Sequence, residues 1–415
     1  MSNMHTFQRT FINHSKKILR QVHSMVFRPN DRIIWNFDEY LPPCNLTGSG
    51  AAPKKALVSY IVKPLLPCQG RRDTSTFSNN GIAQYIPRAL NELGYSVDIV
   101  NYDNRKFIPT KKYDLFIGHT GINFENITEK LDSQCTKIYF STGTYWKSWN
   151  LAEQSRRDDL QSRRGAQLPV DRFIGIDEEY ANTAADGIIC LGNDVAKETY
   201  SKFPSVVNIN NAVFPDKYSI ANKNFNAGRN NFLFFNGWGN VHKGLDLLLD
   251  AFTQLDQHLY VRQDIEPAFL KIYKKELTEY PNIHLVPFLE KPSKDFFSLM
   301  DTCNFIISPT CAEGQPGSVI ECMAHGLIPL LSREANIDTK EFGLTFKENR
   351  AEEIISVVRE VSQKPEAWYK DKSSQTLEEI RNYYTPEQFL KNMKSAVQTI
   401  VQNKSQTLTK TQNIT

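Results

Sequence analysis

Short, continuously apolar runs alternate in the first half of the chain with stretches whose apolar residues recur at helical spacing. In residues 81–93, Ile82, Ile86 and Leu90 fall on one face, and Pro87 either delays the start of this helix or kinks it. The expected strands cover residues 56–62, 96–102, 113–118, 136–141, 186–191 and 206–209. Continuous apolar strands that alternate with helices predict a parallel sheet covered on both faces.

The same alternation restarts after a polar stretch at residues 224–230. The expected strands of this second half cover residues 232–236, 258–261, 283–287, 305–308 and 327–331. The expected helices cover residues 245–255, 267–280, 296–300, 318–325, 351–363 and 386–401. We therefore expect an α/β chain of two Rossmann-like, doubly wound domains, residues 55–220 and 221–383, that face a central cleft. Ligands of such sheets bind outside the carboxyl ends of the strands.

The two ends of the chain differ from the domains in pattern. Residues 1–54 are expected to be an extension that ends in a Pro- and Gly-rich linker. Their first 30 residues carry five basic and no acidic side chains, with an apolar stripe at helical spacing. Such a helix either packs on the protein's own surface or contacts an anionic membrane surface. Residues 403–415 lack an apolar period and are expected to be disordered.

Composition excludes several classes of protein. The chain has 49 Lys and Arg against 46 Asp and Glu, a net charge of +3, which argues against a protein that binds nucleic acid. Its seven cysteines are scattered and show neither a disulfide framework nor metal-ligand spacing. No stretch approaches the roughly 18 apolar residues of a membrane span, and no signal peptide opens the chain. We expect a cytoplasmic protein.

The stretch SPTCAEGQPGSVIECMAHGLIP carries the strongest chemical signal. It begins at the end of an expected strand, and Gly314, Gly317 and Ser318 form a loop that opens a helix. A helix N-terminus behind a glycine loop suits a diphosphate. Glu313 and Glu321 flank this loop, and each carboxylate can accept two hydrogen bonds from a vicinal diol. Taken as an arbitrary acid pair, the same residues also fit a plain strand–turn–helix with surface acids.

The whole stretch resembles the E-x7-E signature of retaining GT-B glycosyltransferases of family 4. The match is carried by Glu313, Gly314, Gly317 (shifted by one position), Glu321, Met323, Ala324, Gly326 and Pro329. The resemblance extends, more thinly, over about residues 55–402. It implies a GT-B fold and transfer of a sugar from a nucleotide-diphosphate sugar, with no cofactor and no essential metal. It also implies that Glu321 binds the nucleotide ribose and that Glu313, as a catalytic residue, contacts the donor sugar.

A second match to this family is FNGWGNVHKGLDLLLDAF, in which Lys243 and Gly244 fit a Lys-Gly that opens a helix and holds the donor diphosphate. The family's arginine, five positions earlier, is Trp238 in this chain. His242, Arg262 or a basic residue from the other domain would then have to supply the missing charge. Otherwise the chain binds its donor weakly. A surface lysine at a helix start is the structural alternative for Lys243.

Three further features bear on the site. His119 follows an expected strand, where the family often has a histidine that faces the donor sugar, although a histidine at a strand end is often structural. The family's last helix crosses back to the first domain, which implies the same for residues 384–402. Four arginines recur at helical spacing and suit either an anionic acceptor, such as a lipid diphosphate, or a salt-bridged face. They are Arg156, Arg157, Arg163 and Arg164.

Together these features predict a retaining glycosyltransferase that moves a sugar to the hydroxyl of a glycan or lipid-linked acceptor. The basic residues at 1–30 add a possible peripheral contact with the cytoplasmic membrane face. Two alternatives stay open: a GT-B nucleotide-sugar epimerase, and a nucleotide-sugar binding protein without catalytic activity, which Trp238 in particular leaves possible.

Overall fold

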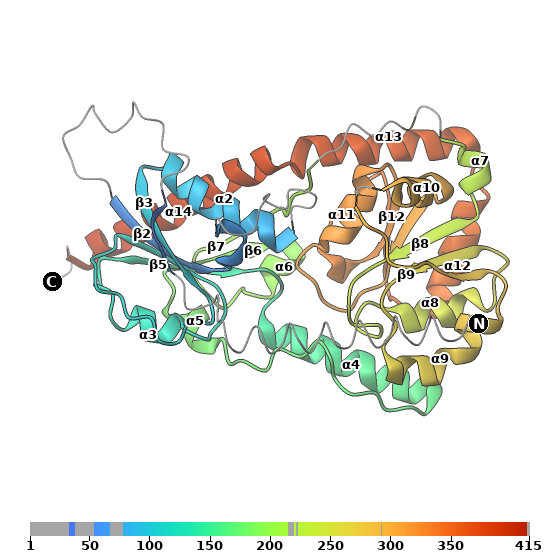
Figure 1. Cartoon of the computed structure of the whole chain (residues 1–415), viewed down its shortest axis with the longest axis horizontal. Coiled ribbons are helices and arrows are strands. Elements are labelled where there is room, and N and C mark those ends of the chain that lie inside the picture. Colours follow the sequence, from blue (N-terminus) through green and yellow to red (C-terminus); the bar gives the residue numbers. More distant parts are fainter. Residues whose placement is uncertain are drawn as a thin grey trace, which may run out of the picture.

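The computed structural model describes residues 33–37, 54–66, 78–214, 220, 223–291 and 293–412. These residues form two α/β units, each built around its own sheet, that lie side by side along the long axis of the molecule (Figure 1). The amphipathic helix expected within residues 1–30 lies outside the described residues, as does most of the linker.

The first sheet has seven strands in the order β1-β3-β2-β4-β5-β6-β7. All neighbours are parallel except β1, which runs antiparallel to β3 at the edge of the sheet. The strands are β1 (Ile33–Phe37), β2 (Lys54–Tyr60), β3 (Tyr95–Asn101), β4 (Leu115–Gly118), β5 (Thr136–Ser141), β6 (Gly187–Leu191) and β7 (Val206–Ile209). Strand β1 corrects the assignment of residues 1–54 to an extension, because its apolar run IIWNF pairs with the sheet.

The helices of this half are α2 (Ser78–Glu92), α3 (Phe124–Thr128), α4 (Trp146–Arg164), α5 (Glu179–Ala184) and α6 (Asp194–Glu198), with a 3-10 turn at Lys63–Leu65. Helix α2 begins three residues before the expected start and contains Pro87 in its interior. Proline there removes a backbone hydrogen bond. Burial of Ile82, Ile86 and Leu90, each no more than 1% exposed, keeps the helix in place against that cost.

The second sheet has six strands, all parallel, in the order β10-β9-β8-β11-β12-β13. The strands are β8 (Asn231–Phe235), β9 (His258–Arg262), β10 (Ile283–Leu285), β11 (Phe305–Ser308), β12 (Ile328–Ser332) and β13 (Leu344–Phe346). The helices are α7 (Phe225–Gly228), α8 (Leu245–Phe252), α9 (Pro267–Glu279), α10 (Lys294–Thr302), α11 (Gly317–Ala324), α12 (Ala351–Ser362) and α13 (Glu366–Tyr383), with a 3-10 turn at Arg333–Ala335.

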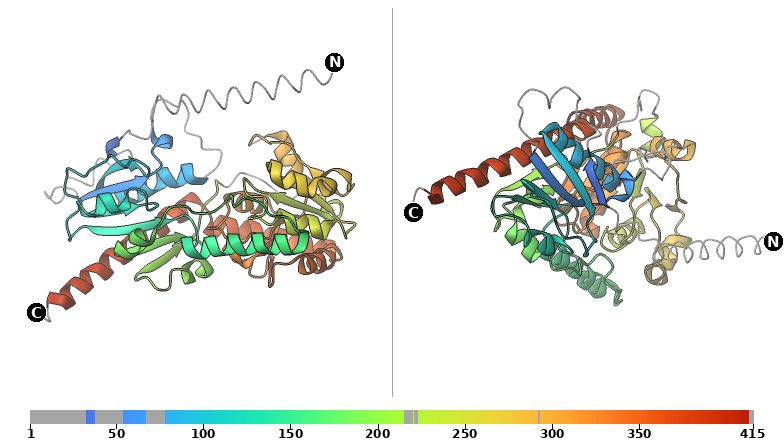
Figure 2. Two further views of the ribbon diagram at one scale, coloured as in Figure 1. Left: turned by 90° about the horizontal axis from the view of Figure 1, so that it is seen from below. Right: turned by 60° about the vertical axis from the view of Figure 1, so that its left-hand side comes forward.

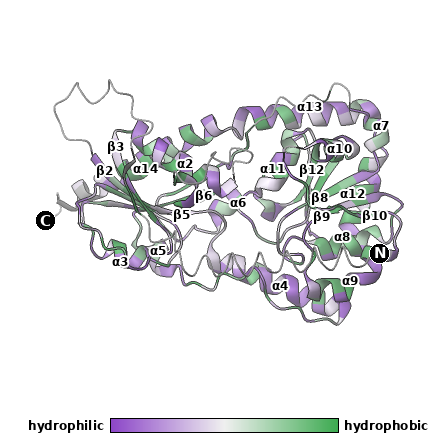
Figure 3. Cartoon of the chain, viewed as in Figure 1, coloured by the Kyte–Doolittle hydropathy of each residue, from purple (hydrophilic) through white to green (hydrophobic). Residues whose placement is uncertain are grey.

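The sequence pattern misses helix α13 because few of its residues are apolar. Tyr369, Leu377 and Ile380 are its buried apolar side chains over 18 residues. Hydrophobic residues concentrate in the strands of both sheets, whereas α4 and α13 are coloured largely as hydrophilic in Figure 3. No helix in the described part of the chain combines the length and apolarity needed to cross a membrane.

The last helix, α14 (Pro386–Gln412), leaves the second unit and packs on α2, β5 and β7 of the first. Phe389, Met393, Val397 and Ile400, which recur at helical spacing, are all buried in the first core. Ile400 lies on Gly187, where a Cβ would come within 2.7 Å of its side chain.

The helix also continues past the expected apolar segment, and its last turns extend beyond the first unit (Figure 2). This corrects the expectation that residues 403–415 are disordered, because residues 403–412 are helical. Polar contacts replace the missing apolar stripe there: the Lys404 ammonium donates to the Cys135 carbonyl at 2.8 Å and pairs with Asp186 at 2.9 Å.

Candidate active site

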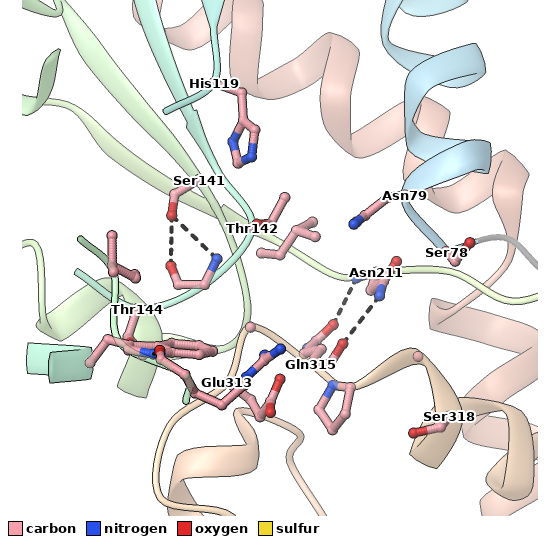
Figure 4. Close-up of a pocket in the computed structure, with 18 of the residues that line it drawn as sticks. Ser78, Asn79, His119, Ser141, Thr142, Thr144, Asn211, Glu313, Gln315 and Ser318 are labelled. Carbon is pink, nitrogen blue, oxygen red and sulfur yellow. Dashed lines mark hydrogen bonds between the residues drawn. The ribbon is translucent and has the colours of Figure 1, made fainter. Parts of the chain in front are cut away.

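A cavity of about 710 Å³ lies between the two units and is lined by residues of both. The first unit contributes His119 after β4, residues 141–144 after β5 and the start of α2 (Figure 4). The second contributes residues 313–318, which lead from the loop after β11 into the start of α11, together with Lys243 and Glu321. The cavity therefore lies at the carboxyl ends of parallel strands, where the sheet topology places ligands.

The loop before α11 connects the two units directly. The Asn211 backbone N–H donates to the Gln315 side-chain oxygen at 2.7 Å, and the Asn211 amide donates to the Gln315 carbonyl at 3.1 Å. Gln315 has a left-handed backbone with φ of 71°, and its own amide donates to the Asn336 carbonyl at 2.9 Å. A Cβ on Gly314 would overlap the Thr142 carbonyl oxygen and approach the Gly143 Cα to 2.5 Å, so only glycine permits this close approach.

Both glutamates of the motif line the cavity and are buried, and each is paired with a lysine. Glu313 forms an ion pair with Lys243, and Glu321 forms one with Lys291. Burial, together with the nearby Arg172 charge, lowers the pKa of Lys243, while Cys311 opposes that shift. Lys291 also lines the cavity, and no spacing or motif in the sequence singled it out.

The donor-binding residues predicted from the sequence do not all line the cavity. Gly317 and Ser318 line the cavity at the start of α11, and Gly314 lines it at the contact between the two units. Gly244 does not line it. Its backbone is left-handed, with φ of 83°, and a Cβ there would overlap the Pro309 carbonyl oxygen. Gly244 therefore sets the start of α8 and the position of Lys243.

His119 projects from the end of β4 into the cavity, on the side opposite Glu313 and Gln315 (Figure 4). Its Nδ1 lies 2.9 Å from the Phe140 carbonyl, which can only accept, so Nδ1 carries the proton. Burial lowers the pKa of His119 to about 4. The neutral ring then has a lone pair on Nε2, which can accept a hydrogen bond from a hydroxyl group.

The four arginines of α4 are not part of this cavity, which corrects the expectation that they form an anionic-acceptor site. Arg156 donates to the Pro309 carbonyl at 3.2 Å, and Arg157 pairs with Glu153 and Asp171. The other two pair with acids of the second unit: Arg163 with Asp246 and Asp250, and Arg164 with Asp250 and Glu276. The guanidinium groups of Arg156, Arg163 and Arg164 therefore attach α4 to the second unit.

His242 is part of the same attachment. It is fully buried, with Nδ1 2.7 Å from Glu153 and Nε2 2.6 Å from the Ala312 carbonyl. Burial lowers the pKa of His242, while Glu153 opposes that shift. Burial raises the pKa of Glu153, but its bonds to His242 and Arg157 outweigh burial and lower it to about 2. His242 is therefore not available to a phosphate in the cavity.

Glu153, His242 and Cys311 also bring possible metal-ligand atoms within 4.8 Å of one another. Both ring nitrogens of His242 are already engaged with Glu153 and Ala312, so this arrangement is explained by the contact between the two units.

Comparisons with known proteins agree with this architecture. Residues 229–364 match the family model described as Glycosyl transferases group 1. No curated protein sequence matches the chain. The solved structure of TarM is 14% identical with a TM-score of 0.50, and the match covers 68% of this chain. It covers 54% of TarM, so this chain spans about half of that protein's length.

Two other solved structures match over most of both chains. Sucrose-phosphate synthase from Thermosynechococcus elongatus is 13% identical with a TM-score of 0.56, covering 84% of this chain and 98% of that one. HepE of Anabaena, in complex with UDP-glucose, is 11% identical with a TM-score of 0.51, covering 84% and 100%. At these identities the likeness concerns the fold. The chain has the GT-B fold, with two Rossmann-like units around a central cleft, and its second unit resembles the glycosyl transferases of group 1.

Proposed function

We propose that this chain is a glycosyltransferase that moves a sugar from a nucleotide-diphosphate sugar to an acceptor hydroxyl, with retention at the anomeric carbon. The observation that carries the proposal is the meeting of Glu313, Glu321 and Lys243 with His119 in one cavity between the two units. Retention is supported by the resemblance of the Glu313–Glu321 stretch to the E-x7-E signature.

The residues suit separate parts of a donor. Lys243 and the positive end of α11 would stabilise the negative charge that develops on the leaving diphosphate. Glu321 would accept hydrogen bonds from the two ribose hydroxyls, with its carboxylate held in place by Lys291. Glu313 and the Nε2 of His119 would contact hydroxyls of the sugar from opposite sides of the cavity.

Transfer with retention would proceed on one face of the sugar. The bond between the anomeric carbon and the diphosphate oxygen breaks, and the acceptor oxygen forms a new bond to that carbon from the same side. The departing diphosphate takes the proton of the acceptor hydroxyl. The protein's part is to hold the donor and to stabilise the charge on the leaving group.

A thermal-shift screen of nucleosides, nucleoside diphosphates and nucleotide sugars tests donor binding, because a ligand that binds the folded state raises the melting temperature. HepE contains UDP-glucose in its structure, so uridine ligands are tested first, followed by guanosine and adenosine ligands. We expect a nucleoside diphosphate to stabilise the protein more than its nucleoside. Glu321→Gln should reduce the stabilisation by both ligands, because both carry the ribose. No stabilisation by any nucleoside diphosphate would contradict the proposal.

One observation favours binding without catalysis: Trp238 stands where the family has an arginine, and its side chain is 54% exposed at the cavity. Turnover of a labelled nucleotide sugar, with and without glycan or lipid-linked acceptors, separates an enzyme from a binding protein. The anomeric configuration of the product, measured by NMR, tests retention. Contact of residues 1–30 with an anionic membrane surface stays a prediction, since these residues lie outside the described part of the chain.

A further inference from the structure

The cationic side chains that line the cavity differ in whether they already form an ion pair with a carboxylate. Among the described residues, the arginines and lysines that line the cavity are Arg172, Lys243 and Lys291. Lys243 is paired with Glu313, and Lys291 with Glu321. Those two pairs are close to neutral overall, whereas a diphosphate brings at least two negative charges. The guanidinium of Arg172 makes no hydrogen bond or ion pair with any described residue, and its Nε is buried without a partner.

Arg172 comes from the first unit, in the segment that follows α4, but its side chain lies against the second unit. A Cβ built on Gly239 would lie 2.8 Å from the Arg172 Cγ and 3.0 Å from its Cδ. The aliphatic part of Arg172 therefore packs on the glycine next to Trp238, in the turn that leads to Lys243. Arginine side chains commonly pack their stems in this way while the charged end reaches a polar site.

The position of Arg172 is fixed by Trp149 of α4. The Trp149 indole N–H donates to the Arg172 carbonyl at 2.5 Å, and the guanidinium carbon lies 5.3 Å from the centre of the Trp149 ring. The neighbouring acid, Asp171, is paired with Arg157 at 2.6 Å. The guanidinium is thus held at the edge of the cavity by a ring rather than by a carboxylate, which leaves its donors for a ligand.

The other basic residues that could replace the missing arginine are engaged elsewhere. His242 is fully buried between Glu153 and Ala312. Arg262 does not line the cavity, and its guanidinium lies 4.9 Å from the centre of the Phe288 ring.

We propose that Arg172 binds the diphosphate of the donor, in place of the arginine that Trp238 replaces. The inference rests on the proposed function, because it concerns the same ligand. Lys243 of the second unit and Arg172 of the first would then hold the diphosphate jointly. Donor binding would depend on contact between the two units, and not on the second unit alone.

The test measures affinities by calorimetry for UDP, GDP and ADP, each against its own nucleoside. The main variant is Arg172→Met, which removes the charge and keeps an apolar stem on Gly239. For the nucleoside diphosphate that the wild type binds, we expect the affinity to fall about tenfold to a hundredfold, the usual effect of one charge-assisted hydrogen bond. The affinity for the matching nucleoside should not change, and Arg172→Lys should recover part of the loss.

Arg262→Ala serves as the matched control, since it removes an arginine that also lies on an aromatic ring but does not line the cavity. It should leave both affinities unchanged. Equal affinity of wild type and Arg172→Met for the nucleoside diphosphate would overturn the role of Arg172 and leave the proposed function standing. Equal weakening of nucleoside and nucleoside diphosphate would show that Arg172 is structural. If the wild type binds none of the three diphosphates, the proposed function and this inference both fail.

Discussion

At the scale of single residues, His119 shows how a backbone contact prepares a side chain for its site. The Phe140 carbonyl accepts the Nδ1 proton, and the edge of the ring lies against Tyr60, with ring centres 5.1 Å apart. Burial of the ring favours the neutral imidazole and outweighs the Phe140 hydrogen bond, which favours the charged form. The folded-state pKa of about 4 lies below the ordinary value of 6.5, so the folded protein binds fewer protons than the unfolded chain between these pH values.

The pH dependence of stability should follow from this shift. The contribution of His119 is fully present above pH 6.5 and is lost as the pH falls through about 4. The loss should amount to about 3–3.5 kcal/mol of unfolding free energy, because the pKa shift from 6.5 to about 4 is about 2.5 units and one unit corresponds to about 1.4 kcal/mol. The glutamine of His119→Gln does not titrate. Between pH 7 and pH 4, the unfolding free energy of this variant, measured in urea, should therefore fall by that amount less than the unfolding free energy of the wild type. The same pH dependence in both proteins would show that the imidazole is not held in the neutral form.

At the scale of elements, α4 connects the two units through its side-chain contacts. It follows β5 in the first sheet, yet Leu160 is buried in the core of the second unit, and the arginines at its end pair with acids of α8 and α9 (Figure 1). Glu153, near the middle of α4, is fully buried and bonds both Arg157 on its own helix and His242 of the other unit.

Replacement of Glu153 by Gln should therefore destabilise the protein strongly. Loss of the carboxylate leaves Arg157 and His242 without their shared buried partner, and breaking a buried pair costs about 3–5 kcal/mol. Asp158→Asn is the matched change on the same helix, because Asp158 is exposed and accepts one hydrogen bond from Gln154. It should change the unfolding free energy by no more than about 0.5 kcal/mol. Urea unfolding measures the change in unfolding free energy of the two variants. Equal changes would show that the buried contacts of Glu153 do not hold α4 against the second unit.

At the scale of the whole molecule, the relative position of the two units is set where chain segments meet at the cavity. The loop at Gly314 and Gln315 lies directly on residues 142–143 and 211 of the first unit. Helix α14 and helix α4 join the units at two other places (Figures 1 and 2). Contact at Gly314 brings His119 and Glu313 to the two sides of one cavity.

Gly314→Ala should open this contact, because the new methyl group would overlap the Thr142 carbonyl oxygen. We expect a larger radius of gyration in X-ray scattering and a loss of turnover of about a hundredfold, as small displacements of reacting groups commonly cause. Gly317→Ala is the control for shape: the nearest atom to a Cβ there, the Asn211 amide nitrogen, is 3.9 Å away. Its radius of gyration should equal that of the wild type. Superimposable scattering of Gly314→Ala and the wild type would rule out a steric role for Gly314.

Local sequence patterns predicted most strands and helices and pointed to the loop before α11 as part of the candidate site. Apolar periodicity depends on neighbouring residues in one strand or helix, and it therefore located nearly all strands of both sheets and the apolar face of α14. The glycines and acids of the stretch from Glu313 to Glu321 indicated the loop before α11. Apolar periodicity missed α13, whose apolar residues are few, and it ended α14 too early, because Lys404 holds that segment by polar contacts.

The pairing of charged groups depends on contacts between residues that are far apart in the sequence. Arg156 and the Pro309 carbonyl are 153 residues apart, and Arg163 and Asp246 are 83 apart, so no local pattern could connect them. The same holds for Lys291 beside Glu321 and for Arg172 beside the turn of Trp238. An arginine pattern on one helix face is identical whether the charges face solvent, a ligand or a second domain. Only folding, which sets the partners available to each guanidinium, assigned Arg156, Arg163 and Arg164 to the contact between the units and placed Arg172 at the cavity.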